Sequence, residues 1–325
     1  MCLSLDERSS MYILGFDIGG TKCAVITAEA DENKIELLEK KSCPTDLSVS
    51  PYEMLAKLCE MADSILTKKP DAVGVSCGGP LNSKKGIILS PPNLPGWDEV
   101  KISDFLEERY NCPVRLQNDA NACAIAEWKY GAGKSTENMI FLTFGTGLGA
   151  GMILGGRLHT GKNDNAGEVG HIRLEDEGPI GYGKKGSFEG FCSGGGLSQL
   201  GYVLAVEAKN KGISPLYFKD GMTQKDVTAK SIAESARLGD ETALEVFRIC
   251  GEKLGRGLSV LVDILNPEAI VLGGIFPRCR DLLLPHLENE IGKEALSLSL
   301  NVCRILPASL GENIGDYGAV CAVFM

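Results

Sequence analysis

The chain has 325 residues, of which 44% are hydrophobic and 23% are charged, and its formal net charge is −10. This composition is ordinary for a soluble globular enzyme with room for two domains, and it contains no membrane-length apolar run and no signal-peptide order in residues 1–10. We therefore expect a cytoplasmic protein without a membrane or nucleic-acid partner, although ATP remains possible because it needs only local positive potential and a metal.

Residues 12–27 predict a β-hairpin whose turn reads DIGGTK. Adjacent glycines, Gly19 and Gly20, let backbone N–H groups converge on an anion. Thr21 adds a donor, and Asp17 at the strand end can reach a metal ion. The hairpin could hold phosphate, or it could be an ordinary hairpin with a polar tip.

A strand at residues 34–41, a helix beginning at Pro51 and a strand at residues 71–76 follow the hairpin. The helix carries apolar residues at helical spacing as far as Leu66. Strands followed by a helix and a further strand indicate an α/β domain.

A turn-rich loop at residues 89–97 contains Asn93 and Trp97. An exposed tryptophan beside an amide would suit a sugar-facing loop, since carbohydrate recognition pairs amide hydrogen bonds with apolar faces. The alternative is a Pro-stiffened loop with the indole packed inward. From the residues alone we favour the inward position for Trp97.

A strand at residues 112–117 delivers Asn118 and Asp119 to an Ala-rich helix at residues 120–130. A carboxylate between a strand end and a helix start can face a cleft, and it is also a common helix N-cap. Without further context, the capping interpretation of Asp119 is the safer one.

Residues 139–154 repeat the pattern of an apolar run, a glycine turn with a hydroxyl, and a second apolar run. The turn sequence GTGLG resembles a dinucleotide fingerprint, but that motif must open a helix, and here the chain continues as a strand. A Rossmann fold is therefore disfavoured. Two phosphate-type hairpins about half a chain apart predict a duplicated architecture that holds one nucleotide from two sides.

A glycine-rich loop at residues 163–171 brings Glu168 close to His171, and a second one at residues 178–196 leads into a helix. In such a loop a histidine is more often polar lining than a metal ligand. Only three histidines occur in the chain, so their count excludes a His-rich metal site.

The last third of the chain predicts a long helix at residues 240–265, a strand at residues 269–272 that ends in Gly273 and Gly274, and a final helix at residues 311–325. The glycine pair would let a flat base or ribose approach the backbone where a helix starts.

The twelve cysteines are scattered singly and form no CxxC pair. In a chain that is neither small nor apparently secreted, disulfides are not expected. We expect most of these cysteines to be small buried apolar residues.

Taken together and in this order, these motifs resemble the ROK family of sugar kinases, in particular its glucokinase-type members. The match runs from about Tyr12 to the end of the chain. The segments that carry it are residues 17–22, 118–122, 143–151, 167–171 and 272–274.

The resemblance implies an α/β fold of the actin and hexokinase type, a duplicated ribonuclease H-like architecture with two lobes around a cleft. The small lobe would comprise residues 1–117, completed by the C-terminal helix at residues 311–325. The large lobe would comprise residues 118–310.

The resemblance also implies roles for individual residues. Asp119 would be the catalytic base that takes the proton from the sugar hydroxyl, and Asp17 would orient Mg²⁺ through water. The nucleotide contacts would be Asp17, Gly19, Gly20, Thr21, Lys22, Thr146, Gly147, Gly273 and Gly274. The sugar contacts would be Gly79, Asn93, Asn118, Glu168, His171 and Glu189.

One segment departs from the family. Many members carry the zinc motif C-x-C-G-x-x-G-C-x-E, whereas residues 180–189 keep both glycines and the glutamate but place Ile180, Tyr182 and Ser187 where the thiolates would be. Structural zinc needs four ligands. We therefore expect no structural zinc, and we expect packing of Ile180 and Phe188 to hold the loop.

The resemblance implies an ATP-dependent kinase that phosphorylates the 6-hydroxyl of a hexose, with glucose as the first candidate and carbohydrate metabolism as its setting. The alternative is an N-acetylmannosamine or other N-acetylhexosamine kinase, because the altered loop lies near the sugar's 1- and 2-positions in the family. A sugar-responsive repressor is disfavoured, since eleven residues before Tyr12 are too few for a helix-turn-helix. Retention of Asp119 disfavours a non-catalytic regulator. A homodimer is expected from similar proteins.

Overall fold

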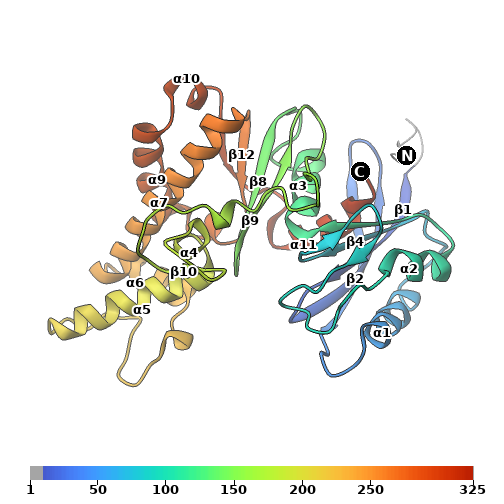
Figure 1. The fold of residues 1–325 in the computed structure, drawn as a ribbon, viewed down its shortest axis with the longest axis horizontal. Coiled ribbons are helices and arrows are strands. Elements are labelled where there is room, and N and C mark those ends of the chain that lie inside the picture. Colours follow the sequence, from blue (N-terminus) through green and yellow to red (C-terminus); the bar gives the residue numbers. More distant parts are fainter. Residues whose placement is uncertain (1–9, 325) are drawn as a thin grey trace. The chain divides into compact units, whose positions relative to one another are not determined.

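The computed structural model describes residues 10–324, which divide into two compact units (Figure 1). Unit 1 comprises Met1–Phe141, Gly151–Gly167 and Ser309–Met325, and unit 2 comprises Leu142–Ala150 and Glu168–Ala308. The predicted lobe limits, residues 117 and 310, stay a prediction. Cys2, Met325 and nearly all of the segment for which we expect no signal peptide lie outside the described residues.

A five-stranded sheet in the order β3-β2-β1-β4-β7 forms the centre of unit 1. Its strands are β1 (Met11–Ile18), β2 (Lys22–Ala30), β3 (Ile35–Pro44), β4 (Ala72–Cys77) and β7 (Val114–Asn118). β1, β2 and β3 pair antiparallel, which confirms the predicted first hairpin and the strand after it. β4 pairs parallel with both β1 and β7.

The three parallel strands of unit 1 end level with one another. Ile18 of β1 lies opposite Cys77 of β4, and Cys77 lies opposite Asn118 of β7. Ligands of open α/β sheets bind outside the carboxyl ends of such strands. The residues that follow these three strand ends are therefore the first place to look for a site.

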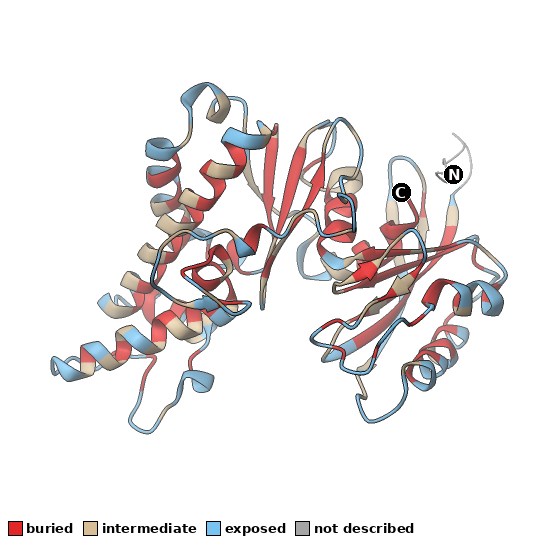
Figure 2. Cartoon of the chain, in the orientation of Figure 1, coloured by how far each residue is buried: buried red, intermediate tan, exposed pale blue. Residues whose placement is uncertain are grey.

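Helices cover both faces of the unit 1 sheet (Figures 1 and 2). α1 (Pro51–Asp63) and α2 (Ile102–Tyr110) enclose a core that contains Trp97, whose side chain is 2% exposed. The inward position favoured for Trp97 is therefore confirmed. α3 (Asp119–Tyr130) and α11 (Ile314–Cys321) pack on the other core. The remaining short elements of this unit are β5 (Leu81–Asn82), β6 (Ile87–Ile88), η3 (Gly311–Asn313) and η4 (Ala322–Phe324).

A second sheet, in the order β13-β12-β8-β9, contains β8 (Met139–Phe144), β9 (Leu148–Ile153), β12 (Ala269–Leu272) and β13 (Arg304–Pro307). β9 follows the glycine turn directly as a strand, as predicted, so the turn does not open a helix and the dinucleotide interpretation is excluded.

Unit 2 is otherwise mostly helical. Its elements are η1 (Val169–His171), β10 (Ile180–Gly181), β11 (Lys184–Lys185), α4 (Phe188–Phe191), α5 (Gly194–Asn210), η2 (Gln224–Asp226), α6 (Ala229–Arg237), α7 (Glu241–Leu265), α8 (Ile275–Arg278), α9 (Arg280–Glu294) and α10 (Ser297–Leu300). Asp240 caps the predicted long helix α7, and Asn266 ends it in a left-handed conformation. Within residues 10–324, no helix combines the length and the apolar character that crossing a membrane requires.

The described cysteines are all free thiols. Cys43, Cys112 and Cys303 are half-buried and the others are buried, as expected for small apolar residues.

Glu127 is a fully buried carboxylate that joins α3 to the segment before α11. It accepts hydrogen bonds from the N–H groups of Ala132 (2.7 Å), Ser309 (2.9 Å) and Leu310 (2.9 Å). We expect Glu127→Ala to lower the free energy of unfolding by about 2–5 kcal/mol, because three backbone donors lose their partner. Urea unfolding measures this change. The exposed Glu108→Ala is the control, and equal stability of the two variants would contradict the prediction.

Candidate active site

The sugar-binding candidates of unit 1 lie together at the carboxyl ends of its parallel strands. A Cβ placed on Gly20 would lie 2.3 Å from the carbonyl oxygen of Asn93, so only glycine lets the first turn pack this closely on the Asn93 loop. The amide nitrogen of Asn118 lies 3.4 Å from the equivalent position on Gly79. Gly20, Gly79, Asn93 and Asn118 therefore occupy one edge of the sheet.

The inward-packed Trp97 helps to position Asn93. The backbone N–H of Trp97 donates to the carbonyl of Leu94 (3.2 Å), and the backbone carbonyl of Trp97 accepts from Ser90 N–H (3.0 Å). The loop is therefore tied to a residue whose indole is buried. Asn93 itself is exposed. The loop thus combines both alternatives considered for it, with the tryptophan in the core and the amide available to a ligand.

The first turn is held in place by Thr45, which the sequence did not single out. The Thr45 hydroxyl donates to the Gly19 carbonyl (2.6 Å), and its N–H donates to the Thr21 carbonyl (3.0 Å). Thr21 and Lys22 are exposed. The turn is therefore fixed, while its hydroxyl and ammonium groups lie on exposed residues where an anion could reach them.

Asp17 lies beside a small cavity of about 220 Å³. Burial raises the pKa of its carboxyl to about 6, and repulsion from Asp316 and Asp119 adds to the shift, while Lys40 and Lys22 oppose it. A Cβ on Gly315 would lie 3.2 Å from Asp17 Oδ2. The start of α11 therefore forms one wall of this cavity.

The Asp17 carboxylate fits a magnesium ion whose other ligands are substrate phosphates and water. No group of three or more His, Cys, Asp or Glu side chains among residues 10–324 could hold a metal by itself. Mg²⁺ is usually held by one or two carboxylates together with substrate phosphates and water. A single carboxylate at the edge of a cavity matches that mode.

Lys40 and Asp316 form an ion pair of 2.5 Å in the wall of the same cavity. The Asp316 side chain is buried, whereas that of Lys40 is partly exposed. Both change the electrostatics of Asp17. No local pattern could have revealed this pair, because its members are 276 residues apart.

Asp119 is the first residue of α3, and Asn118 is the N-cap. The Asn118 side chain accepts from the N–H groups of Ala120 (3.0 Å) and Asn121 (3.4 Å). The expectation that Asp119 itself caps the helix is therefore wrong, since the neighbouring amide occupies that place.

The Asp119 carboxylate is accessible to solvent, and its Oδ1 accepts from Ala120 N–H (2.8 Å). Residue Asp119 is exposed, but protein atoms surround its carboxyl group closely enough that desolvation raises the pKa of this carboxyl. An accessible carboxylate with a raised pKa is suited to accept a proton.

In unit 2, the predicted phosphate turn carries Thr146 exposed at its tip. Gly194 N–H, at the start of the 17-residue helix α5, donates to the carbonyl of Gly145 in that turn (2.7 Å). The beginning of α5 is thus next to the turn, which the sequence analysis missed. The available signal was Ser193, a helix cap followed by three glycines.

Glu189 uses one carboxylate oxygen to hold the same hairpin, because its Oε2 accepts from Leu148 N–H (3.0 Å). Glu168 and His171 lie on one short turn, with His171 N–H donating to the Glu168 carbonyl (3.1 Å), and both are exposed. The sugar-binding roles of these three residues stay predictions.

Gly273 and Gly274 lie at the end of β12. Gly274 has a φ of 62°, and a Cβ there would lie 2.0 Å from the carbonyl oxygen of Phe144, so the glycine is required for packing on β8. Contact of this pair with a nucleotide stays a prediction.

The loop at residues 180–189 is held differently from our expectation. Phe188 is fully buried, but Ile180 is 47% exposed, so packing of Ile180 does not fix the loop. Instead, the Gln199 side chain bonds both the N–H (2.9 Å) and the carbonyl (2.8 Å) of Ile180. We expect elemental analysis of the purified protein to find no stoichiometric zinc, because the three positions carry no thiolate. One zinc per chain would contradict this.

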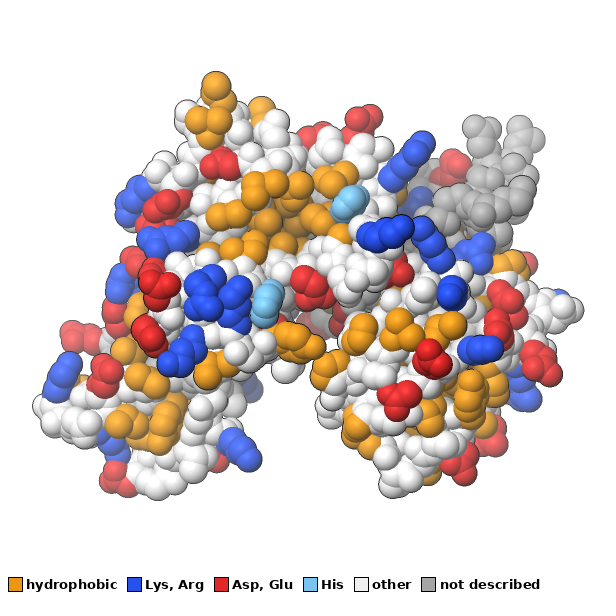
Figure 3. All heavy atoms as spheres, in the orientation of Figure 1, with side chains coloured by type: hydrophobic (Ala, Val, Ile, Leu, Met, Phe, Trp, Pro, Cys, Tyr) orange, Lys and Arg blue, Asp and Glu red, His pale blue; other side chains and the backbone are white. Residues whose placement is uncertain are grey.

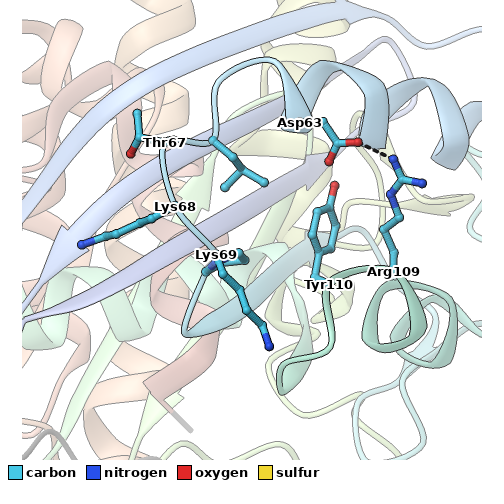
Figure 4. Close-up of a pocket in the computed structure, with 8 residues that line it drawn as sticks. Asp63, Thr67, Lys68, Lys69, Arg109 and Tyr110 are labelled. Atoms are coloured by element: carbon cyan, nitrogen blue, oxygen red, sulfur yellow. Dashed lines mark hydrogen bonds and ion pairs between the residues drawn. The ribbon is translucent and has the colours of Figure 1, made fainter.

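Another cavity of unit 1, about 410 Å³, lies elsewhere (Figure 4). Two of its basic lining residues are paired, since Arg109 binds Asp63 and Lys68 binds Glu29. None of the predicted site residues lines it. Cavity volume alone would therefore point away from the predicted site residues.

The sequence pattern of the ROK family matches residues 13–324. The chain belongs to the ROK family. Its relatives include a glucokinase of Halalkalibacterium halodurans, 31% identical over 320 residues that cover 95% of this chain and 94% of the relative. The xylose repressor of Bacillus subtilis is 27% identical over 319 residues, covering 96% of this chain and 77% of the repressor.

Among solved structures, a ROK family glucokinase from Streptomyces griseus, in complex with glucose and AMPPNP, is similar with a TM-score of 0.77. It is 30% identical, and the match covers 95% of this chain and 98% of that one. The predicted family, the sugar kinase class and the actin and hexokinase type of fold are thereby confirmed for this ROK protein.

Proposed function

We propose that this ROK protein transfers the γ-phosphoryl group of ATP to the 6-hydroxyl of a hexose, with glucose as the first candidate. The observation that carries the proposal is the level ending of β1, β4 and β7, which brings Asp17 and Asp119 to the same edge of the sheet as Asn93 and Asn118. A phosphate-type turn and a set of sugar-type amides thus adjoin one accessible carboxylate.

In this proposal Asp119 accepts the proton of the sugar hydroxyl at its free carboxylate oxygen. Phosphoryl transfer depends mainly on alignment and charge stabilisation, so one carboxylate within hydrogen-bond reach of the nucleophile is sufficient. Thr21 and Lys22 would bind phosphate oxygens. When bound, Mg²⁺ neutralises charge on the phosphates, and Asp17 would orient it through water.

Two findings support ATP and glucose without identifying the substrates of this chain. The similar Streptomyces griseus enzyme was solved with glucose and AMPPNP, and the Halalkalibacterium halodurans relative is a glucokinase. The alternative, an N-acetylhexosamine such as N-acetylmannosamine, is favoured by one local feature. Three positions of the loop at residues 180–189 carry residues other than the expected cysteines, and Tyr182 is 74% exposed there.

Steady-state rates with ATP and Mg²⁺ across glucose, mannose, allose, N-acetylmannosamine and N-acetylglucosamine test the proposal. We expect kcat/KM to be highest for glucose, because the polar residues at the site would match its hydroxyl pattern, and an unmatched buried polar group costs about 1–3 kcal/mol. A preference for N-acetylmannosamine would establish the alternative. No turnover of any of the five sugars would contradict a hexose kinase.

A regulatory role would require nucleic-acid binding, as the relation to a xylose repressor suggests. On the face seen in Figure 3, acidic and basic side chains are interspersed rather than gathered into one basic surface. We expect no tight duplex binding, which a salt titration would test.

We also propose that the protein is a cytoplasmic homodimer.

A further inference from the structure

The segment that leads to Glu168 forms a closed loop in unit 1. Ala166 N–H donates to the carbonyl of Thr160 (3.1 Å), which joins the two ends of the loop. Within it, Asp164 has a φ of 61°. Aspartate adopts this left-handed conformation more readily than most residues, but it still needs support from its surroundings.

The carboxylate of Asp164 supplies that support by binding Ser83, 81 residues away in the chain. Ser83 N–H donates to Oδ2 (2.8 Å), and the Ser83 hydroxyl donates to Oδ1 (2.9 Å). Both residues are half-buried. Hydrogen bonds to an ionised carboxylate are about twice as strong as neutral ones, and two of them fix an orientation.

The Asp164–Ser83 pair joins two segments that lie within four residues of predicted sugar contacts. Ser83 follows Gly79 by four residues and lies in the turn between β5 and β6. Asp164 precedes Glu168 by four residues, and the chain passes from unit 1 to unit 2 between Gly167 and Glu168. The pair therefore fixes the last part of unit 1 before Glu168.

We propose that Asp164 is a positioning residue for the sugar, and that its two bonds to Ser83 hold the loop that delivers Glu168. This inference rests on the proposed function together with the sugar contact that the family resemblance implies for Glu168. If the loop were free, binding of the sugar would have to order it, and part of the interaction free energy would be lost to that ordering. The predicted nucleotide contacts, such as Asp17 and Thr146, do not depend on this loop.

Asp164→Gly is the first test, because glycine removes both hydrogen bonds and accepts the positive φ without strain. We expect it to raise the KM for glucose at least about tenfold, since misplaced positioning groups cost about 10–100-fold, while the KM for ATP stays within about twofold. Asp164→Asn is the conservative variant. Its oxygen can accept from Ser83 N–H and its amide can donate to the Ser83 hydroxyl, so it should restore a near wild-type KM for glucose.

Two further variants separate the effect of the Asp164–Ser83 hydrogen bonds from the general effect of losing a surface carboxylate. Asp31→Gly removes a comparable carboxylate, which accepts from the N–H groups of Asn33 (2.7 Å) and Lys34 (2.8 Å) in another turn, and it should leave both KM values unchanged. Ser83→Ala should raise the KM for glucose in the wild-type background. It should add nothing to Asp164→Gly, because the partner is already absent.

Hydrogen–deuterium exchange of residues 160–167 gives a readout that does not depend on turnover. We expect Asp164→Gly to speed exchange of the Ala166 amide, and Asp164→Asn to preserve its protection. A wild-type KM for glucose in Asp164→Gly, or equal loss in Asp164→Gly and Asp164→Asn, overturns the inference.

Failure of the proposed function is distinguishable from failure of this inference. If the wild-type protein phosphorylates neither glucose nor N-acetylmannosamine, the function is wrong, and calorimetric affinity for the two sugars then replaces KM as the measure. Weaker sugar binding by Asp164→Gly would support the positioning role, whereas unchanged or absent sugar binding would overturn it.

Discussion

Replacing Asp119 with asparagine should reduce kcat by about 10²–10⁴-fold, the usual contribution of a general base, while glucose still binds with nearly wild-type affinity. Asparagine keeps the size of the side chain and an oxygen for the Ala120 N–H, but it cannot take a proton. Steady-state kinetics together with calorimetry of glucose binding would measure both quantities.

Asp71→Asn is the matched control for this experiment. Its carboxylate accepts from Tyr12 N–H (2.7 Å), and the asparagine oxygen can accept the same bond. We expect a wild-type kcat for it. If Asp119→Asn kept activity within about tenfold of wild type, Asp119 would not be the base.

Replacing Asp17 with asparagine should abolish most activity and at the same time stabilise the metal-free protein at pH 8. The folded-state pKa of Asp17, about 6, lies above its ordinary value of 3.8. The stability that its protonation contributes is therefore fully present below pH 3.8, and it is lost as the pH rises through 6. Above that range the folded protein contains a charged carboxylate in unfavourable surroundings.

For Asp17→Asn we expect a gain of about 1–2 kcal/mol at pH 8, reduced from the roughly 3 kcal/mol of the full shift because the side chain is only partly buried. The gain should shrink toward pH 5, where the wild-type carboxyl is increasingly protonated. Thermal unfolding in a chelator at both pH values would measure it. The exposed Asp176→Asn is the control, and a gain that is equal at pH 5 and pH 8 would argue against the electrostatic origin.

The elements that the sequence predicted well are those defined by local order. The DIGGTK turn between two apolar runs becomes the β1–β2 hairpin, and the apolar spacing before Asn266 becomes α7. The turn before Leu148 was correctly separated from a dinucleotide fingerprint, because that motif must open a helix and the apolar run after this turn continues as a strand.

The parts that could not be predicted depend on residues far apart in the chain, or on a choice between neighbouring residues of similar chemistry. Asn118 and Asp119 are both good helix caps, so only the backbone decides which of them caps α3. The Lys40–Asp316 pair joins a side chain of β3 to a side chain of α11, and its members are too far apart in the chain for any sequence spacing to indicate it. Ile180 is apolar and was expected inside, but the residue that holds this loop is a glutamine from α5.

The two bonds between Gln199 and the backbone of Ile180 have a consequence for the environments in which the protein keeps its shape. A cage of thiolates loses its ion to chelators, oxidises in peroxide and releases metal when protonated. A carboxamide does none of these. The architecture around Glu189 should therefore persist in a cell that is starved of zinc or exposed to oxidants.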